Sequence, residues 1–364
     1  MAPNDPALQV LIDRVASALT AGVQLCIHGS GTKAFYGEAV QGESLDTRGL
    51  EGISSYEPSE LVVTARCGTS LAALESTLAE QGQCLAFEPP HFAPGTTVGG
   101  MVACGLSGPS RAASGSLRDH LLGATVLNGR NEVLTFGGQV MKNVAGYDVS
   151  RLMAGAMGIL GVILEVSLKV VPIAPASATL RFRMEETEAL ARLNQWGGQA
   201  LPLNASAWRD GTLVLRLAGA QSAVNAAKST LGGEPLDADL ANAFWDGLRH
   251  HGDEYFARAR AEVEAGGALW RLSVPQTAPA LSLAGEQLIE WGGAQRWLRS
   301  TLPAGQVRDA AERVGGHATL FRARNKAAGA FAPLRAPLDR IHRDLKKSFD
   351  PSGIFNPGRL YPGL

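Results

Sequence analysis

Glycine is concentrated in one part of this chain, and that concentration restricts the folds open to it. Residues 95–161 hold 14 of the 43 glycines in the 364-residue chain. A folded segment this rich in glycine gives up much conformational entropy, so its backbone must need positive φ angles or close approach to another group. The segment therefore predicts a place where the backbone itself meets a partner.

A second glycine motif follows a short apolar strand pattern near the N-terminus. The stretch "CIHGSGTKAFYG" (26–37) satisfies the G-x-G-x-x-G/A spacing of Rossmann dinucleotide sites. In that fold a helix begins at the third small residue, but the following "FYGEAVQGES" has no helical period, and the Walker spacing is absent. Backbone N–H groups around glycines can still form a nest for an anion, aided by Ser30, Thr32 and Lys33. By itself the loop is therefore either a phosphate nest or a plain tight turn.

Apolar periodicity in the first half predicts mixed helices and strands. The segments 7–20 and 71–82 have a helical period, and Gly82 is placed to end the second helix. The segment 124–136 predicts a hairpin around Asn128-Gly129. The alternation over 161–171 predicts a half-buried strand.

The second half is also mixed. Strand patterns at 178–184, 212–219, 268–274 and 317–324 are separated by helical stretches such as 236–263. An antiparallel sheet backed by helices fits this order. A last helix over about 335–348 carries Leu338, Ile341 and Leu345 on one face. The fold class predicted for the whole chain is therefore α+β.

Composition and charge exclude several classes of function. A formal net charge of -1 provides no basic footprint for nucleic acid. The longest apolar stretch, at 154–164, is shorter than the roughly 18 residues of a spanning helix. The N-terminal segment has no cationic region typical of a signal peptide, so we expect a cytoplasmic protein. The four cysteines form no C-x-x-C pair, which predicts reduced thiols and neither a structural zinc site nor an iron–sulfur cluster in this chain.

Four segments together resemble the flavin-binding family typified by vanillyl-alcohol oxidase and p-cresol methylhydroxylase. They are "HGSGTK" (28–33), "PGTTVGGMVACGLSG" (94–108), "SGSLRDHLLGATVL" (114–127) and "VMKNVAGYDVSRLMAGAMGILGVILEV" (140–166). The resemblance implies an extended FAD held between two subdomains, with the first loop at the pyrophosphate. It also implies three regions: a p-cresol methylhydroxylase-type FAD-binding domain over 1–173, an α+β cap or substrate domain over 174–332, and a C-terminal helix and tail over 333–364 that returns to the flavin.

A narrower resemblance covers nearly the whole chain. The motifs "EPPHF", "GGMVACGLSGP", "GGQVMKNVAGYDVSRLM", "GEQLIEWGGAQRWL", "GGHAT" and "DPSGIFNPGR" occur in the order typical of the FAD-binding E subunits of bacterial glycolate oxidases. This family implies a complex with a second FAD-binding subunit and an iron–sulfur subunit. Glycolate would be oxidised to glyoxylate, with electrons passing to a membrane acceptor and only peripheral association with the membrane.

The resemblance carries the cofactor-binding role to individual residues. The pyrophosphate nest is expected at Gly29, Ser30, Gly31, Thr32 and Lys33. A second wall is expected at Pro94, Gly95, Thr96, Thr97, Gly99 and Gly100, and a third segment at Ser114, Arg118 and Asp119. Gly158, Gly161 and Ile163 match the backbone that meets adenine, and Asn356 matches the residue near the isoalloxazine. Covalent relatives carry a histidine where this chain has Thr32, so non-covalent FAD is expected.

The residues for substrate chemistry are less well defined. Removing a hydride from an alcohol carbon needs a base within hydrogen-bond reach and cations for the carboxylate. His317 could be that base, with Arg322 or Arg324 binding the carboxylate; equally, His317 could be structural and the arginines solvated. No acidic residue adjoins His317, and no metal site is proposed.

Other histidines and tryptophans are interpreted as structural. His28 is expected to end a strand as a hydrogen-bonded residue, and His91 to pack in a proline-stiffened loop. His250 and His251 are expected on a surface helix, where adjacent positions do not share a face. The tryptophans at 291 and 297 are expected in the core.

Three functions remain open. The first is an FAD-containing subunit of a glycolate-oxidising complex. The second is an autonomous FAD-dependent 2-hydroxy-acid dehydrogenase. The third is a scaffold subunit that keeps the fold without the flavin.

Overall fold

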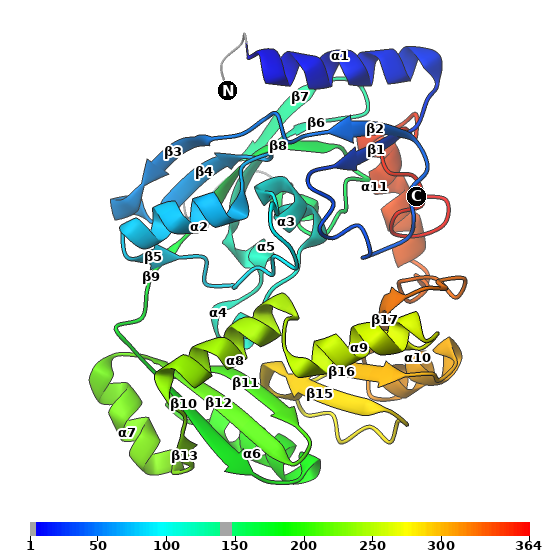
Figure 1. Cartoon of the computed structure of the whole chain (residues 1–364). Coiled ribbons are helices and arrows are strands. Elements are labelled where there is room, and N and C mark those ends of the chain that lie inside the picture. The colour runs from blue at the N-terminus through cyan, green and yellow to red at the C-terminus, as the bar shows by residue number, and fades with distance from the viewer. Residues whose placement is uncertain (1–4, 139–147) are drawn as a thin grey trace.

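The computed structural model describes residues 5–138 and 148–364 and has an α+β fold (Figure 1). Residues 140–147, which open the fourth flavin-family motif, lie outside the described residues. The elements of the first half are α1 (Pro6–Ala21), β1 (Leu25–His28), β2 (Glu43–Asp46), β3 (Ile53–Glu57), η1 (Pro58–Glu60), β4 (Val62–Arg66), α2 (Leu71–Glu80), β5 (Gln83–Cys84), α3 (Val98–Cys104), α4 (Arg111–Ser114), α5 (Leu117–His120), β6 (Leu121–Leu127), β7 (Val133–Gly137), η2 (Ser150–Met153), β8 (Val162–Lys169) and β9 (Val171–Pro172).

Five of these strands form one antiparallel sheet in the order β3-β4-β8-β6-β7, and β1 pairs with β2 in parallel beside it. The predicted strand over 161–171 does form, as β8, but it is not half-buried. Val162, Ile163 and Leu164 are buried one after another. Both faces of the strand are covered because apolar side chains of α1, α2 and α3 join the same core.

The predicted hairpin over 124–136 is confirmed as the antiparallel pair β6 and β7. Its connection runs from residue 128 to 132, and Asn131, not Gly129, has the positive φ, at 61°. Gly129 meets the C-terminal segment instead. Its N–H donates to the carbonyl of Phe349 at 2.8 Å, and a Cβ there would lie 2.4 Å from Oδ1 of Asp350.

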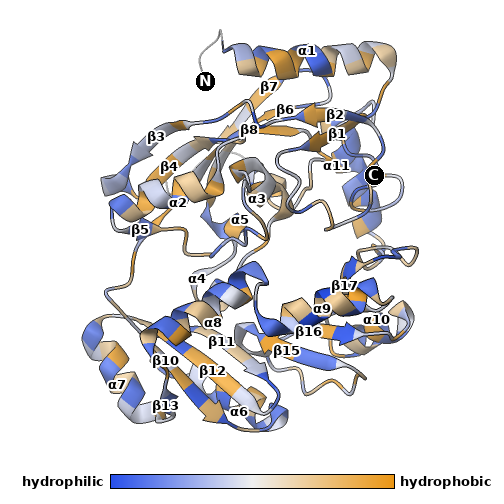
Figure 2. Ribbon diagram, viewed as in Figure 1, coloured by the Kyte–Doolittle hydropathy of each residue, from blue (hydrophilic) through white to orange (hydrophobic). Residues whose placement is uncertain are grey.

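The second half is built on one eight-stranded antiparallel sheet, as the strand patterns predict, in the order β13-β10-β12-β11-β15-β16-β14-β17. Its elements are β10 (Ala176–Arg183), α6 (Glu186–Gly197), β11 (Leu203–Arg209), β12 (Thr212–Gly219), α7 (Gln221–Leu231), β13 (Glu234–Pro235), α8 (Ala238–His250), α9 (Glu254–Glu264), β14 (Ala268–Ser273), β15 (Glu286–Glu290), η3 (Trp291–Gly293), β16 (Gln295–Ser300), α10 (Ala304–Arg313) and β17 (His317–Ala323). Helices α8 and α9 lie on the face of this sheet that is turned toward the first half (Figure 1). Strand β12 is largely hydrophobic, whereas α11 (Leu338–Phe349), the last helix of the chain, is mainly hydrophilic (Figure 2).

The predicted helix over 236–263 is two helices. α8 ends at His251, which takes the left-handed conformation with φ 55°, and Asp253 then caps α9 by accepting from the N–H of Phe256. The left-handed residue turns the chain between the helices. It also carries the ring of His251 into the protein, where only 7% of the residue is exposed. The expectation that His251 lies on a surface helix is therefore wrong.

The C-terminal helix and tail return to the first half. The apolar positions Leu338 and Ile341 of α11 are about half exposed, so they do not face a core. The helix is anchored instead by Lys346, whose Nζ donates to Asp350 and to the carbonyls of Ile159 and Phe355. Phe355 then pairs with Leu25 of β1, which brings the tail beside the loop that follows β1.

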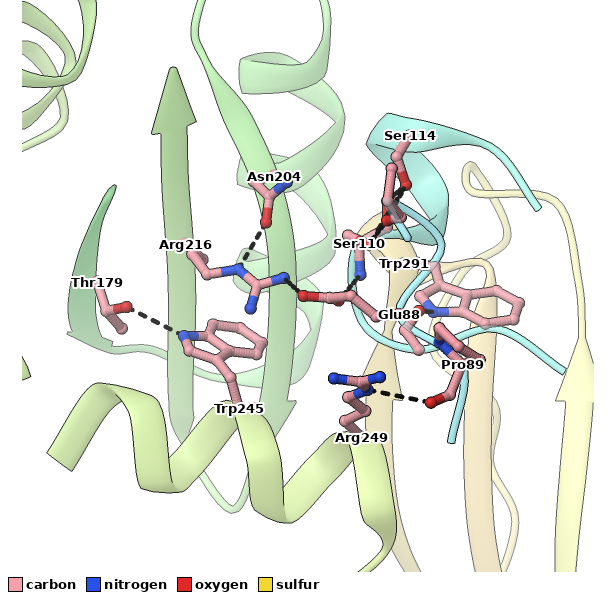
Figure 3. Close-up of polar contacts among 12 residues, drawn as sticks. Glu88, Pro89, Ser110, Ser114, Thr179, Asn204, Arg216, Trp245, Arg249 and Trp291 are labelled. Carbon is pink, nitrogen blue, oxygen red and sulfur yellow. Dashed lines mark hydrogen bonds and ion pairs between the residues drawn. The ribbon is translucent and has the colours of Figure 1, made fainter. Parts of the chain in front are cut away.

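Specific polar contacts join the two halves (Figure 3). Arg216 on β12 donates to Glu88 of the first half at 2.6 Å, and Glu88 also accepts from the N–H of Ser110. Nearby, the indole of Trp291 donates to the carbonyl of Gly108 at 3.0 Å, and Arg249 donates to the carbonyl of Pro89 at 3.1 Å. These contacts hold the second half of the chain against residues 88–110 of the first half.

Among the helices within 5–138 and 148–364, none has the length and apolar character needed to cross a membrane.

Candidate functional site

A cavity of about 380 Å³ opens beside the loop that follows β1. Four separate segments form most of its wall: residues 26–34, the region from Thr97 to Cys104 that includes α3, residues 157–163, and the C-terminal tail. The predicted site residues among its lining are Gly29, Ser30, Gly31, Thr32, Lys33, Thr97, Gly99, Gly100, Gly158, Gly161, Ile163 and Asn356. Twelve of the predicted cofactor-binding residues, drawn from all four segments, therefore line one cavity.

The loop at 29–33 offers this cavity a row of backbone donors. β1 ends at His28, and Gly31 takes a positive φ of 75°, which reverses the chain without starting a helix. Within the described residues, none of the five N–H groups from Gly29 to Lys33 donates to a protein acceptor. Unpaired N–H groups around a left-handed glycine are the arrangement of an anion-binding nest. The loop therefore has the geometry of a nest and is more than a turn.

Gly29 brings the nest close to the second wall of the cavity. A Cβ built on Gly29 would lie 2.4 Å from Oγ1 of Thr97, the residue that caps α3 by accepting from the N–H of Gly100. Any side chain at position 29 would push the loop away from α3. The motif needs glycine at position 29 so that the loop can approach Thr97, and at position 31 so that the backbone can take a positive φ.

Lys33 provides a cation without a partner. The residue is 6% exposed, and its Nζ has no hydrogen-bond partner among the described residues. The ammonium lies 5.7 Å from the ring centroid of Phe92. Burial lowers the pKa of Lys33 to about 8, so the amine is still mostly charged at neutral pH. A buried charge is costly unless it is paired, so an anion in the cavity would satisfy this group.

The tail contributes two residues to the cavity. Asn356 accepts from the N–H of Ile27 at 2.7 Å and donates from Nδ2 to the carbonyl of Met157 at 2.7 Å. Arg359 donates to the carbonyl of Ala34 at 3.0 Å and to that of Glu38. Both side chains hold the walls together through bonds within the protein.

The structure places two of the predicted cofactor-binding residues next to each other. The resemblance implies that Gly158 meets adenine and that Asn356 lies near the isoalloxazine, which are opposite ends of an extended FAD. The two residues are neighbours, because a Cβ on Gly158 would lie 2.5 Å from Nδ2 of Asn356. They therefore belong to the same end of the cavity.

Six predicted residues do not line this cavity. Three of them, Pro94, Gly95 and Thr96, adjoin the nest loop outside the cavity. Oγ1 of Thr96 contacts Oγ1 of Thr32 at 3.0 Å, and a Cβ built on Gly95 would lie 3.7 Å from the Cβ of Ser30. The other three are Ser114, Arg118 and Asp119. Oγ of Ser114 donates to the carbonyl of Ala86 at 2.7 Å, Asp119 caps its own helix α5, and Arg118 is exposed. The structure does not bring this third segment to the cavity.

The residues predicted for substrate chemistry are not together. His317 and Arg322 lie five positions apart on β17, which is about 16 Å along an extended strand. His317 is exposed, and Arg324 is paired with Glu264 on the surface. The structure therefore does not bring His317 together with Arg322 or Arg324 in one site.

Several cavity residues were missed by the sequence reasoning. They include Cys26, Ile27, His28, Cys67, Cys104, Met157 and Arg359. Arg359 belongs to the quoted motif "DPSGIFNPGR", so the motif itself was the available signal for it. The cysteines and Met157 have no pattern that marks them, because only the fold brings their strands and loops to one wall.

The structural histidines and tryptophans follow the predictions with one exception. His28 ends β1 and contacts Oγ of Ser44 through Nε2 at 2.6 Å, and His91 contacts Glu75 at 2.9 Å. Trp291 and Trp297 are buried. The exception is His251, which stacks on Phe256 with a centroid separation of 3.6 Å. In the described part of the chain, no three His, Cys, Asp or Glu residues are grouped so that they could hold a metal ion.

Comparison with known proteins agrees with the cavity. A family model described as "FAD binding domain" matches residues 8–137. The glycolate oxidase subunit GlcE of Escherichia coli is 47% identical over 356 residues, which cover 98% of each chain. A D-lactate dehydrogenase of Anaerostipes hadrus is 34% identical over 128 residues, covering 35% of this chain and 26% of that one.

The fold has a distant relative among solved structures. An alkyldihydroxyacetonephosphate synthase superposes with a TM-score of 0.63 at 14% identity, over 97% of this chain and 76% of the other. The nest, the unpaired Lys33 and the glycine-lined wall fit FAD, which is the cofactor of this domain. Because nearly half of all residues are identical along almost the full length of both chains, this protein belongs to the family of the glycolate oxidase subunit GlcE, a family of FAD-dependent oxidoreductases.

Proposed function

We propose that this chain is the FAD-binding subunit of a complex that oxidises glycolate to glyoxylate. The observation that carries the proposal is the buried Nζ of Lys33 beside five unpaired N–H groups in the 29–33 loop. Together they form a site for a diphosphate in a chain of the GlcE family. The wall segments at 97–104 and 157–163 would enclose the rest of the cofactor.

The binding is proposed to be non-covalent. Oγ1 of Thr32, at the position where covalent relatives have histidine, contacts Oγ1 of Thr96, and a hydroxyl is no substitute for an imidazole as a flavin-linking group. Bound FAD would supply the two-electron acceptor for the alcohol carbon. The protein's own residues bind the diphosphate, exclude water along the apolar wall and keep the two halves together.

The proposed partners are a second FAD-binding subunit and an iron–sulfur subunit, through which electrons would reach a membrane acceptor. The complex would lie in the cytoplasm, with peripheral attachment to the membrane. Within the chain, we propose an FAD-binding domain over 1–173, a cap domain over 174–332 and a returning tail over 333–364. The five-stranded and eight-stranded sheets lie in the first and second of these regions, which supports the division.

The alternative is an autonomous FAD-dependent 2-hydroxy-acid dehydrogenase. One observation favours it: a second cavity, lined by Arg260 and Arg322, shares Thr32 with the first. A scaffold without flavin is disfavoured, because without a bound anion the buried ammonium of Lys33 would stay unpaired, which is costly.

The test is purification of the chain alone and of the complex, with flavin measured in each. We expect flavin absorbance in the isolated chain, and release of that flavin into the supernatant when the protein is precipitated with acid. Absence of flavin would remove both oxidoreductase hypotheses and leave the scaffold. Anaerobic bleaching by glycolate in the isolated chain would favour the autonomous enzyme, whereas bleaching only in the complex would favour the subunit.

A further inference from the structure

The second cavity, of about 630 Å³, lies between the two halves of the chain. Its lining comes from the first half through Thr32, Phe35 and residues 91–94, and from the second half through residues 250–252, Arg260 and Arg322. It meets the FAD cavity at Thr32, which lines both. A molecule in this cavity would therefore lie next to the nest.

The charge of this cavity is positive and uncompensated. No acidic side chain is among its lining residues. Within the described chain, neither Arg260 nor Arg322 has a carboxylate within 4.0 Å, although most other arginines of the second half do. Burial, together with the charge of Arg260, lowers the pKa of Arg322 to about 10. Two neighbouring guanidinium groups without a carboxylate repel one another, and an anion between them would remove that cost.

The arginines are held in place. The guanidinium of Arg322 lies over the ring of Phe35, with Cζ 3.3 Å from the ring centroid, and the same atom is 5.8 Å from the ring centroid of Phe92. Nη1 of Arg260 donates to the carbonyl of His251 at 2.6 Å. A guanidinium with a fixed plane binds a planar carboxylate through two parallel hydrogen bonds.

His250 adds a neutral donor. The N–H of His91 donates to Nδ1 of His250 at 3.2 Å, so the proton of the His250 ring is on Nε2. Burial lowers the pKa of His250 to about 4, which keeps the ring neutral at neutral pH. Nε2 has no acceptor among the described residues and is available to a ligand.

His251 lies at the inner end of this cavity. It is 7% exposed, its Nδ1 has no partner among the described residues, and its ring is 4.8 Å from that of Phe92. Burial holds the pKa of His251 well below its usual value. The cavity thus has two cations, two neutral imidazoles and aromatic walls.

We propose that Arg260 and Arg322 bind the carboxylate of a small 2-hydroxy acid in this second cavity, with His250 as an additional donor. The inference rests on the proposed function, because that function supplies the acid. It would place a binding site for the substrate on this chain itself, in a cavity that shares Thr32 with the FAD cavity.

The experiment is calorimetric titration of the full-length chain with oxalate, a carboxylate that cannot lose a hydride. We expect saturable binding by the unmodified chain. Removing one charged partner of a carboxylate should weaken oxalate binding about 10- to 100-fold, so we expect this loss for Arg322→Met and for Arg260→Met.

Each variant has a matched control. Arg324→Met lies two residues after Arg322, just beyond the end of β17, where Arg324 is paired with exposed Glu264. Arg258→Met lies on the same helix as Arg260, where Arg258 is paired with Glu286. Both controls should bind oxalate as the unmodified chain does, and circular dichroism should show that all four variants are folded. Equal weakening in variants and controls would overturn the proposal.

Two further measurements separate the possible failures. Flavin content should be the same in Arg322→Met and the unmodified chain; selective loss of flavin from the variant would mean that Arg322 serves the cofactor and would overturn the carboxylate site. Inorganic phosphate should bind more weakly than oxalate, and equal or tighter binding of phosphate would overturn the assignment to a carboxylate. A chain that holds FAD but does not bind oxalate refutes this inference alone, whereas a chain without FAD refutes the proposed function.

Discussion

At the scale of single residues, the site is defined by groups that the protein leaves unsatisfied. Most buried polar atoms in proteins have a partner, and an unpaired buried ammonium is costly. Lys33 is such a group, whereas Lys346, which is also buried, has three acceptors. The unpaired ammonium of Lys33 is available to bind a ligand, whereas the paired ammonium of Lys346 stabilises the fold.

Lys33→Met should therefore affect binding and stability in opposite ways. Without the ammonium, affinity for FAD should fall about 10- to 100-fold, because one charge-assisted contact to the diphosphate is lost. The flavin-free protein should be as stable as before or more stable, because an unpaired buried charge has been removed. Fluorescence titration with FAD and thermal unfolding of the apoprotein measure the two effects. Loss of apoprotein stability would show that Lys33 has a structural role, and exposed Lys347→Met is the control that should change neither.

The pKa of Lys33 predicts how FAD affinity depends on pH. The pKa of the free protein is lowered to about 8 by burial, and a phosphate beside the ammonium would favour the charged form and raise it. FAD binding should then take up protons above pH 8, so the affinity should be constant below about pH 8 and should fall as the pH rises beyond it. Titrations between pH 6.5 and about 9.5 measure this slope. The same slope in Lys33→Met would assign it to another group.

Gly29→Ala should disturb the nest through Thr97. The new methyl would lie 2.4 Å from Oγ1 of Thr97, and this contact should displace the loop and weaken FAD binding at least tenfold. Thr97→Ala removes the nearest atoms, so the double variant should recover part of the affinity although α3 loses a cap worth about 1 kcal/mol. Measurement of FAD affinity in both single variants and the double variant tests this. Simple additivity would show that the two residues do not interact.

At the scale of elements, the tail beyond α11 is part of the site. Asp350 accepts from Lys346 and from the N–H groups of Ile354 and Phe355, which fixes the turn that leads to Asn356. Asn356 then links β1 to the 157–163 segment. The cavity wall thus depends on a helix that begins more than 300 residues after the nest.

Lys346→Met should loosen this wall. It leaves Asp350 buried without its cation, and breaking a buried pair from one side costs about 3–5 kcal/mol. Urea unfolding of the apoprotein should show this loss. Adjacent Lys347 is exposed, and Lys347→Met should stay within about 0.5 kcal/mol of the unmodified protein. A similar small effect for Lys346→Met would show that the tail is held by apolar packing alone.

At the scale of the whole molecule, the second cavity depends on how the two halves are joined, because residues of both halves line it. This cavity lies between the two halves. The hydrogen-bonded ion pair of Glu88 and Arg216 is one of the contacts that hold the halves against each other (Figure 3). Both side chains are largely buried, at 23% and 14% exposure, and Glu88 is also held by the N–H of Ser110. Such a pair should be worth more than one on the surface.

A double-mutant cycle tests this comparison. Glu88→Gln and Arg216→Met should show a coupling energy of about 1–3 kcal/mol in unfolding, whereas the exposed pair Arg181 and Glu234 should show about 0.5 kcal/mol or less. Thermal or urea unfolding of the unmodified protein and of the six single and double variants gives both values. Equal couplings would show that the bond between the halves adds no stability beyond that of a surface ion pair.

Much of the fold could be predicted from local pattern. The mixed α+β class, the β6–β7 hairpin and the antiparallel second sheet follow from periodicity and turn residues, which act between neighbours in the chain. The errors arose where burial was set by distant segments. The alternation of apolar and polar residues in the sequence predicts a half-buried β8. The sequence of the strand does not show that helices cover its second face. The break at His251 was missed because a left-handed residue other than glycine has no clear signal.

By itself, the sequence determined the kind of anion site this chain would have. Two glycines and a lysine after a strand, with no helical pattern behind them, specify a nest, because the requirement for positive φ and close approach is local to the residues that carry it. Only the tertiary structure decided which other residues share that site. It put Asn356 beside Gly158, separated His317 from Arg322, and brought Arg260, His250 and Arg322 to one cavity. The contacts between these residues join segments tens to hundreds of residues apart, so they depend on how the sheets and helices pack and leave no periodic trace along the chain.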